Sequence, residues 1–296
     1  MHRTAEFLRA GQGALSRFHA DPRHWQLVAL SGLLSLSWLG SDFGSSPQIL
    51  AAALCGALGV EALGAWWRRR TGRRPKPLQW KSALITAFGV SLLLRADALW
   101  IWSAAAAFAI AAKLLLRWNG KQLFNPACSG ILAALWVSGG QAWVSAGQWG
   151  QTSLVAGYAL GMAALTLSSA RRLDIALGFL GSFAALAVTR ALWLGDPLAI
   201  AWHQLSSGSL LIFAFFMVTD PRSTPDSRRG RLLFAAAVAV LASALHWGPN
   251  VQAAPLVALA AVGLLTPLLD QHLPGRRFRW TAAERRPLIP HSLEVR

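Results

Sequence analysis

The chain has 296 residues, of which 54% are hydrophobic and only 14% are charged, whereas a soluble domain carries about 25% charged residues. So little polar surface cannot coat a soluble globule, and the composition therefore indicates an integral membrane protein. The formal net charge of +16 also occurs in proteins that bind nucleic acid. Here, however, the basic residues form short clusters between long apolar runs, which is typical of loops that face anionic lipid and argues against nucleic acid as a partner.

Apolar runs follow one another along the chain and predict an all-α membrane bundle of about ten transmembrane helices. The runs lie at residues 25–40, 47–67, 82–95, 98–117, 126–139, 150–169, 173–194, 205–219, 231–247 and 251–269. Several of them have the roughly 20 residues that a helix needs to cross a bilayer. Three are shorter, and we expect these to be half-helices or tilted helices buried among their neighbours: 82–95, 126–139 and 205–219.

The positions of the basic residues predict how this bundle is oriented. Of the 28 lysines and arginines, 26 fall on one side of the predicted membrane, and only Arg95 and Arg190 fall on the other. Because lysine and arginine accumulate in cytoplasmic loops, we expect a multi-pass protein of the bacterial cytoplasmic (inner) membrane with both termini in the cytoplasm. The expected parts are a cytoplasmic N-terminal segment (1–24), a single transmembrane domain (25–270) and a basic cytoplasmic tail (271–296).

Two short stretches of the chain are similar to each other. SALITAFGV (Ser82 to Val90) and SLLIFAFFM (Ser209 to Met217) share 5 of 9 residues, although short apolar stretches also match by chance. The stretches fall in the third and eighth predicted spans, which cross the membrane in opposite directions. The match therefore predicts two inverted five-helix halves, at about 25–139 and 150–270, with a functional site at their interface near the membrane midplane.

Polar residues in a membrane chain are informative because burying them without partners costs several kcal/mol. In WNGKQLFNPACSG (Trp118 to Gly130), Pro126 fits the first turn of a helix and Asn125 its cap. The competing interpretation is a niche for a flat ring, in which amide groups and an aromatic face come from Asn119, Gly120, Phe124 and Asn125.

Two acidic residues near apolar runs have ordinary expected partners. Thr219-Asp220-Pro221 ends the eighth span, because proline cannot continue the helix, and we expect Asp220 to pair with one of the arginines at 222, 228, 229 and 231. For Glu61, the most deeply placed acid, we expect pairing with Arg68 or Arg69. The chain suggests no catalytic set and no metal site, and its two cysteines lie in or beside apolar runs.

Several of these segments, taken in order, resemble one family: the D subunit of the Rnf electron-transport complex and its relative, the B subunit of the sodium-translocating NADH:quinone reductase. The segments are KSALITAFGVSLLL, AKLLLRWNGKQLFNPA, GQWGQTSL, SGSLLIFAFFMVTDPRSTPDSRRGRLLF and TPLLD, and the resemblance runs from about residue 25 to residue 272. FNPA together with FFMVTDP followed by RGRL is its most specific part. The resemblance implies ten spans in two inverted halves, a flavin that carries electrons through the bilayer, and coupling to sodium or proton movement.

The same resemblance implies where a non-covalent flavin, either riboflavin or FMN, or a quinone-like ring would bind. Gly120 and Asn125 best match the polar cytoplasmic loop of the family. We expect the ring to lie where this loop meets the turn at Thr219 and Asp220, with the approach lined by Ser206, Gly208 and Ser209.

One departure from the family concerns covalent flavin. Family members usually carry FMN on a threonine in a motif that resembles D-G-x-S-x-A-T-P-L, whereas between Ala127 and Gly147 this chain has only CSGILAALWVSGGQAWVSA. Thr152 lies nearby but matches a different family position, so we expect no covalent FMN. Short members without the motif occur among proteins associated with enediyne biosynthesis clusters, and this chain is more similar to those.

The expected function is that of a membrane subunit in an Rnf- or Nqr-like electron-transport complex, without a catalytic set of its own. The chain has no Gly-rich dinucleotide or phosphate loop between a strand and a helix, so other membrane or redox subunits would supply the electrons. Two alternatives stay open: a solute or ion transporter with an inverted-repeat fold, and a membrane scaffold in a biosynthetic cluster.

Overall fold

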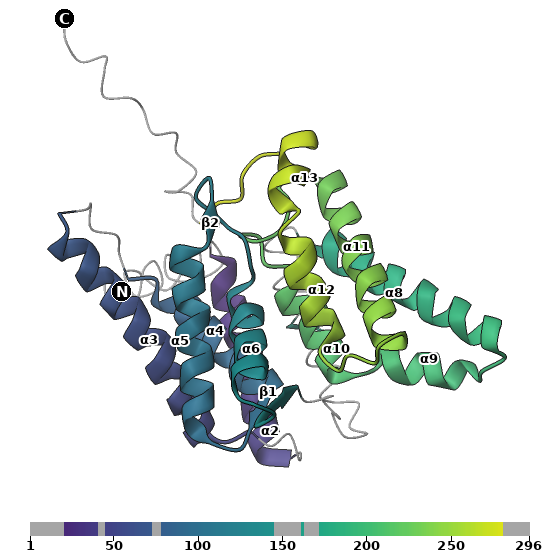
Figure 1. Ribbon diagram of the computed structural model, residues 1–296, viewed down its shortest axis with the longest axis horizontal. Helices are drawn as coiled ribbons and strands as arrows, with labels where there is room; N and C mark the ends of the chain where they lie inside the picture. Colours follow the sequence, from purple (N-terminus) through teal and green to yellow (C-terminus); the bar gives the residue numbers. More distant parts are fainter. Residues whose placement is uncertain (1–20, 41–44, 73–77, 145–160, 163–171, 281–296) are drawn as a thin grey trace, which may run out of the picture.

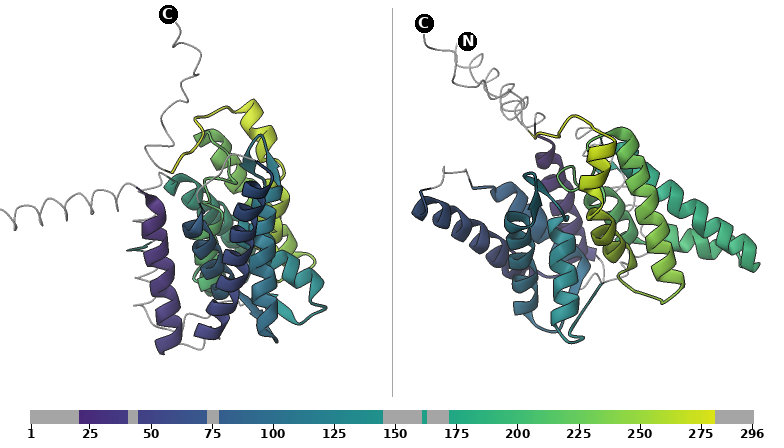
Figure 2. Two further views of the ribbon diagram at one scale, coloured as in Figure 1. Left: turned by 90° about the vertical axis from the view of Figure 1, so that its left-hand side faces the viewer. Right: turned by 45° about the horizontal axis from the view of Figure 1, so that its top comes forward.

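The computed structural model describes residues 21–40, 45–72, 78–144, 161–162 and 172–280, and this part of the chain is mostly helical (Figure 1). Its helices are α2 (Pro22–Gly40), α3 (Pro47–Arg70), α4 (Trp80–Leu93), α5 (Leu99–Leu115), α6 (Pro126–Val137), α8 (Leu173–Leu194), α9 (Leu198–Leu205), α10 (Gly208–Ile212), the π-helix η1 (Phe213–Met217), α11 (Arg228–Trp247), α12 (Ala254–Gly263) and α13 (Thr266–His272). Its strands are β1 (Leu94–Ala96), β2 (Arg117–Trp118), β3 (Lys121–Gln122) and β4 (Ala142–Val144). Helices α2 to α6 lie together on one side of the molecule, and α8 to α13 lie on the other (Figures 1 and 2).

Several of these helices are long and apolar enough to cross a membrane. Among the described residues, α3, α8 and α11 each pass this test, and two bent pairs, α9 with α10 and η1, and α12 with α13, raise the number to 5. Helices α4, α5 and α6 are shorter apolar helices. The predicted run at 150–169 lies almost entirely outside the described residues, so the count of ten spans and the inversion of the two halves stay predictions.

The short helices end in backbone that is paired in other ways. Helix α4 has 14 residues, which is about 21 Å at 1.5 Å per residue and less than the roughly 30 Å of a hydrocarbon core. The chain continues directly into β1, which pairs antiparallel with β4 through Leu94 with Val144 and Ala96 with Ala142. Non-helical backbone is tolerated at membrane depth only where other protein groups satisfy it, and this ladder provides such partners.

One continuous hydrophobic core runs from α2 through α12. Helix α5 packs between α3 and α6 with its backbone close to both. A Cβ atom added at Gly56 of α3 would overlap the carbonyl oxygen of Ser103, and one at Gly130 of α6 would overlap that of Ala105. Small residues permit this close approach of membrane helices, so the glycines fix how the first group of helices packs.

Polar contacts join the two helix groups at the end of the molecule that carries the β2–β3 hairpin, the turn after η1, α13 and residues 273–280 (top of Figure 1). We call this the basic end. Lys121 of the hairpin lies 3.1 Å from Asp226 and 2.6 Å from Asp270, and Asp270 also accepts the Asp226 N–H at 2.8 Å. The hairpin of the first group is thereby held against the second group.

A second polar cluster at the basic end joins the start of α2 to α4. Asp21, which is only 4% exposed, receives Arg23 Nη2 at 2.8 Å and Lys81 Nζ at 2.9 Å. Burial alone would raise the pKa of Asp21, but the hydrogen bonds from Arg23 and Lys81 outweigh it and lower the pKa from 3.8 to about 2. The folded state therefore holds this carboxylate ionised more firmly than the unfolded chain does.

This linkage gives Asp21 a defined pH signature. Because the folded pKa is depressed, its contribution is present in full above the unfolded value of 3.8 and is lost as the pH falls toward about 2. We expect Asp21→Asn to lower the free energy of unfolding at neutral pH by about 2 kcal/mol, with the difference from the parent shrinking through this window. Unfolding in detergent at several pH values measures it, with the exposed Asp97→Asn as control. A constant difference across the window would contradict the assignment.

Candidate functional site

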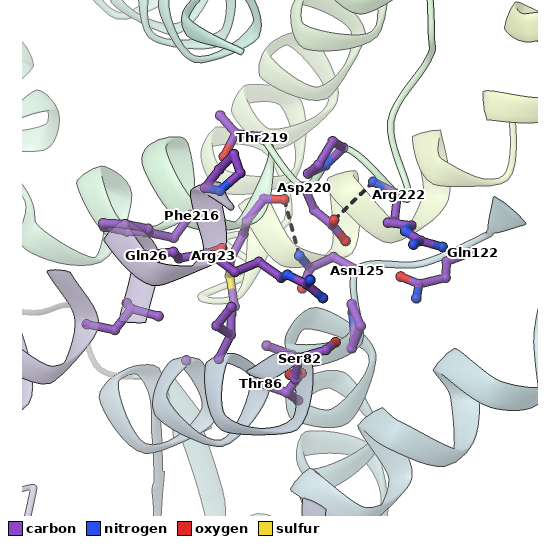
Figure 3. Close-up of a pocket in the computed structure, with 18 of the residues that line it drawn as sticks. Arg23, Gln26, Ser82, Thr86, Gln122, Asn125, Phe216, Thr219, Asp220 and Arg222 are labelled. Atoms are coloured by element: carbon purple, nitrogen blue, oxygen red, sulfur yellow. Dashed lines mark hydrogen bonds between the residues drawn. The ribbon is translucent and has the colours of Figure 1, made fainter. Parts of the chain in front are cut away.

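A cavity of about 80 Å³ opens at the basic end. Its walls come from the starts of α2, α4 and α6, from η1 and from the turn that follows η1 (Figure 3). The walls combine amide, hydroxyl and guanidinium groups with aromatic and aliphatic side chains. Such a mixture suits a ligand that has polar atoms on an otherwise apolar body.

The two similar sequence stretches form two of the walls. The first contributes Ser82, Ile85, Thr86 and Gly89 from α4, and the second contributes Ile212, Phe215, Phe216 and Met217. Two aligned positions line the cavity from both sides, Ile85 with Ile212 and Gly89 with Phe216. Figure 3 draws Ser82 and Thr86 on one wall and Phe216 and Thr219 on the other. The cavity thus lies between the stretches that the sequence aligns.

Asn125 joins α6 to η1 at the cavity wall. Its Oδ1 accepts the N–H of Cys128 at 3.0 Å, so the prediction that Asn125 caps a helix beginning at Pro126 is confirmed. Its Nδ2 donates to the carbonyl oxygen of Met217 at 3.3 Å (Figure 3). An amide nitrogen has two N–H groups, and the described residues occupy one of them. Asn125 therefore caps α6 and also lines the cavity, and its second amide N–H donates to none of the described residues.

Asp220 shapes the turn beside the cavity. Its carboxylate accepts the backbone N–H of Arg222 and the hydroxyl of Ser223, each at 3.1 Å. Burial is the largest influence and raises the pKa of Asp220, while these two hydrogen bonds oppose it. Of the expected arginine partners, Arg231 binds Asp174 instead, while the charge of Arg222 acts on the Asp220 carboxylate and lowers its pKa.

Asn119, Gly120 and Phe124 lie outside the cavity. Asn119 and Gly120 form the exposed two-residue turn of the β2–β3 hairpin, with φ angles of 48° and 75°. Positive φ at both positions is what a tight hairpin turn requires, and Asn-Gly is its usual sequence. The Phe124 ring faces α12, where its Cδ1 lies 3.9 Å from the place a Cβ on Gly263 would take.

Ser206, Gly208 and Ser209 lie at the break between α9 and α10. The Ser206 hydroxyl donates to Trp202 O at 2.9 Å, and Ser207 and Ser209 share a hydrogen bond at 3.0 Å. None of these residues lines the cavity. Of the sequence-predicted site residues, the structure brings together Asn125, Thr219 and Asp220.

A buried ion pair stands behind the α4 wall. Lys113 Nζ lies 3.0 Å from Glu61 Oε2, with the two side chains 0% and 1% exposed. Lys113 also donates to Ser82 Oγ at 3.3 Å, and Glu61 Oε1 accepts the N–H of Gln79 at 3.2 Å. Ser82 and Gln79 both line the cavity, so the ion pair holds this wall in place.

The ion pair corrects two sequence expectations. Lys113 counts among the loop charges in the predicted topology but lies in the last turn of α5, and Glu61 pairs with Lys113 rather than with Arg68 or Arg69. The physical reason is that the side chain of Lys113 points into the bundle, where Glu61 is the counter-ion within reach. A lysine set one turn inside an apolar run is the signal that points to this arrangement.

Three further lining residues carry little sequence signal. Arg23 and Gln26 come from the start of α2, and Trp280 comes from the C-terminal segment. The Arg23 guanidinium lies 5.1 Å from the centre of the Trp280 ring, in the range of a cation–π contact. These residues meet only through the tertiary fold; Gln26, a polar residue within an apolar run, is the one hint that the sequence carries.

The donor set fits one edge of a flavin ring. The residues that line the cavity include Gln26, Gln79, Ser82 and Asn125, which carry amide or hydroxyl groups, and the aromatic Phe216. The enclosed volume of about 80 Å³ is smaller than the 300–1,000 Å³ typical of small-molecule pockets. The enclosed space therefore holds only part of such a cofactor.

Comparisons with known proteins point in the same direction as the sequence motifs. The model of the NQR2, RnfD, RnfE family matches residues 137–279. The curated relatives include the D subunits of the ion-translocating oxidoreductase complex from Escherichia coli O81 (strain ED1a), O127:H6 (strain E2348/69 / EPEC) and strain K12 / DH10B, each 30% identical over 152 residues. Each match covers 51% of this chain but only 39% of the relative.

The matched stretch includes η1 and the turn that carries Thr219, Asp220 and Arg222, while Asn125 and the α4 wall lie before it. The described residues also contain several helices that are long and apolar enough to cross a membrane. The model of this family thus matches just under half of the chain, and the chain spans about two fifths of the length of the curated relatives it matches.

Proposed function

We propose that the chain is a membrane subunit of an Rnf- or Nqr-like electron-transport complex and that it passes electrons by way of a non-covalent flavin. The observation that carries the proposal is the cavity, because its walls come from the two similar stretches and from the FNPA segment that the family resemblance singles out. The match of residues 137–279 to the model of the NQR2, RnfD, RnfE family supports it.

The residues have distinct roles in this proposal. Asn125 donates its second amide N–H to the ring edge, and Gln26 and Gln79 offer further hydrogen bonds. Phe216 and Trp280, which line the cavity, would contact the ring and help to exclude water. A bound flavin supplies the redox chemistry, while the protein supplies binding, orientation and electrostatics. Partner subunits supply the electrons.

Blocking the cavity tests this site. We expect Ile85→Trp, which fills the cavity, to weaken riboflavin or FMN binding by at least about tenfold, or 1.4 kcal/mol. Leu84→Trp is the matched control, because Leu84 is the preceding residue of α4 and does not line the cavity. Quenching of flavin fluorescence on titration into the purified protein measures both affinities. Equal affinities for the two variants would place any flavin elsewhere.

The proposal includes the ten-span topology with both termini in the cytoplasm. In a background without Cys55 and Cys128, single cysteines at the exposed positions Thr71 and Arg229 should react with a membrane-impermeant reagent only from the cytoplasm, and one at the exposed Gln141 only from outside. The 26-to-2 distribution of basic residues motivates this prediction. Labelling of Thr71→Cys and Gln141→Cys from the same side would contradict the ten-span order.

A specific observation favours a second candidate function, the movement of ions or small solutes. Two helix pairs are broken and bent, by 51° between α9 and the α10–η1 unit and by 48° between α12 and α13. Discontinuous helices of this kind build the central sites of many transporters. Ion or solute flux into liposomes by a protein that binds no flavin would support this function over electron transfer.

A further inference from the structure

Four arginines from separate segments gather around the β2–β3 hairpin at the basic end. They are Arg68 near the end of α3, Arg117 in β2, Arg222 in the turn after η1 and Arg277 in the C-terminal segment, and we call them the arginine cluster. Burial is the main cause that lowers the pKa of Arg117, and the charges of Arg222, Arg68 and Arg277 lower it further. The guanidinium groups of Arg68, Arg222 and Arg277 therefore all lie close enough to Arg117 to act on its charge.

Arg117 lies next to a residue that lines the cavity, and Arg222 lines it directly. Arg117 Nε donates to the carbonyl oxygen of Lys113 at 2.7 Å, and Arg117 pairs across the hairpin with Gln122. Gln122 and Arg222 both line the cavity, and Figure 3 draws them side by side at one of its edges. The cluster thus adjoins the cavity through Arg222.

The C-terminal segment brings Arg277 to the same place. A Cβ atom added at Gly275 would overlap the backbone at Asp226 and Ser227, so this part of the segment packs closely on the turn before α11. Arg277 Nη2 then lies 3.7 Å from the place that a Cβ on Gly120 would take, over the hairpin turn. Arg68 Nε is buried and has no hydrogen-bond partner among the described residues.

Among the groups that act on Arg117, three are cationic and one is a carboxylate. Glu61 is the carboxylate that most favours the charged form of Arg117, and it is already bound to Lys113 and to the Gln79 N–H. When like charges lie close together in partly buried positions, each disfavours the charged form of the other. An anion that enters the cluster relieves this repulsion.

We propose that the arginine cluster binds a phosphate group beside the cavity. A guanidinium group presents a rigid fork of N–H donors that matches phosphate oxygens in pairs, and a phosphate has enough oxygens to engage several arginines at once. The group comes either from a phosphorylated ring ligand such as FMN or from the headgroup of an anionic phospholipid. The site goes beyond the proposed function, because the cluster takes a phosphate whether or not a flavin ring occupies the cavity.

Inorganic phosphate is the first probe. Full-length protein in a neutral detergent should show a higher melting temperature in phosphate than in chloride at equal ionic strength. We expect Arg117→Gln, Arg222→Gln and Arg277→Gln each to weaken phosphate binding by about tenfold or more, because each removes a guanidinium group and its charge-assisted hydrogen bonds to the phosphate. Arg277 is exposed, so its variant tests the site even where Arg117→Gln fails to fold.

The matched controls are Arg228→Gln and Arg229→Gln. Both residues are exposed arginines in the first turn of α11, also at the basic end, so they remove the same charge outside the cluster. They should keep the phosphate response of the parent protein. An equal loss in the controls and in the cluster variants, or no response beyond that of chloride in the parent, would overturn the site.

Two further arms identify the source of the phosphate. If FMN is the ligand, it binds about tenfold or more tightly than riboflavin, which has the same ring, and Arg117→Gln abolishes the difference. If a lipid is the ligand, FMN and riboflavin bind alike, and nanodiscs of phosphatidylglycerol, but not of phosphatidylcholine, remove the phosphate response. If the protein binds phosphate but neither riboflavin nor FMN, the phosphate site is supported and the proposed redox function is contradicted.

Discussion

Lys113→Met is expected to lower the free energy of unfolding by about 3–5 kcal/mol, the cost of leaving a buried charge without its partner. Glu61 is 1% exposed and would keep only the N–H of Gln79 as a hydrogen-bond donor. The substitution also frees Ser82 from Lys113, so the α4 wall of the cavity loosens and flavin affinity falls with stability. Denaturant unfolding in detergent, followed by helical circular dichroism, measures the first effect.

The double variant Glu61→Gln with Lys113→Met separates charge from packing. Since replacing a buried ion pair with neutral groups is often close to neutral, the double variant should recover most of the loss. Arg190→Met is the control for removing a membrane-end cation, because Arg190 and Asp196 are 37% and 36% exposed and 3.7 Å apart, and such pairs contribute about 0–1 kcal/mol. A Lys113→Met variant no less stable than Arg190→Met would contradict the role of the ion pair.

Asn125→Leu is expected to reduce both stability and ligand binding. It removes the cap of α6 and the bond to Met217, which together are worth about 1–3 kcal/mol of stability. It also leaves polar atoms of the ligand unpaired, a further loss of about 1–3 kcal/mol in binding, or roughly 5- to 150-fold in affinity. Thermal unfolding and flavin titration of the same variant report the two effects separately.

Asn125→Ser distinguishes the cap from the ligand contact. Serine caps helices about as well as asparagine, but its hydroxyl cannot replace the amide N–H that reaches Met217 and the cavity. We expect Asn125→Ser to retain more stability than Asn125→Leu and to lose a similar part of the flavin affinity. Unchanged flavin affinity together with a lowered melting temperature in Asn125→Leu would reduce the residue to a helix cap.

Much of the helical framework follows from local sequence signals. Pro126 and Asn125 predict where α6 begins, and the short apolar runs predict the shortness of α4 and α6. These features are predictable because caps, prolines and run lengths act within a few residues. The sequence similarity between Ser82–Val90 and Ser209–Met217 also points to the region in which the cavity lies.

The site itself is predictable only in part. Asn119 and Gly120 suggest a ligand niche by their polar groups, although Asn-Gly is foremost a signal for a tight hairpin turn, and the turn is what the structure shows. Lys113 resembles a loop charge in the sequence because the direction of its side chain depends on helix packing. Gln26 and Trp280 reach the cavity from opposite ends of the described chain, and no local pattern in one sequence encodes such a contact.

Anaerobic reductive titration of the purified protein, after loading with riboflavin or FMN, tests the central claim most directly. We predict an oxidised-flavin absorbance that bleaches on reduction, returns on reoxidation and leaves with the supernatant when the protein is denatured, with Ile85→Trp markedly depleted in flavin. A protein that stays colourless after loading would contradict the electron-transfer function, and flavin fluorescence that stays on the denatured chain in a gel would contradict non-covalent binding.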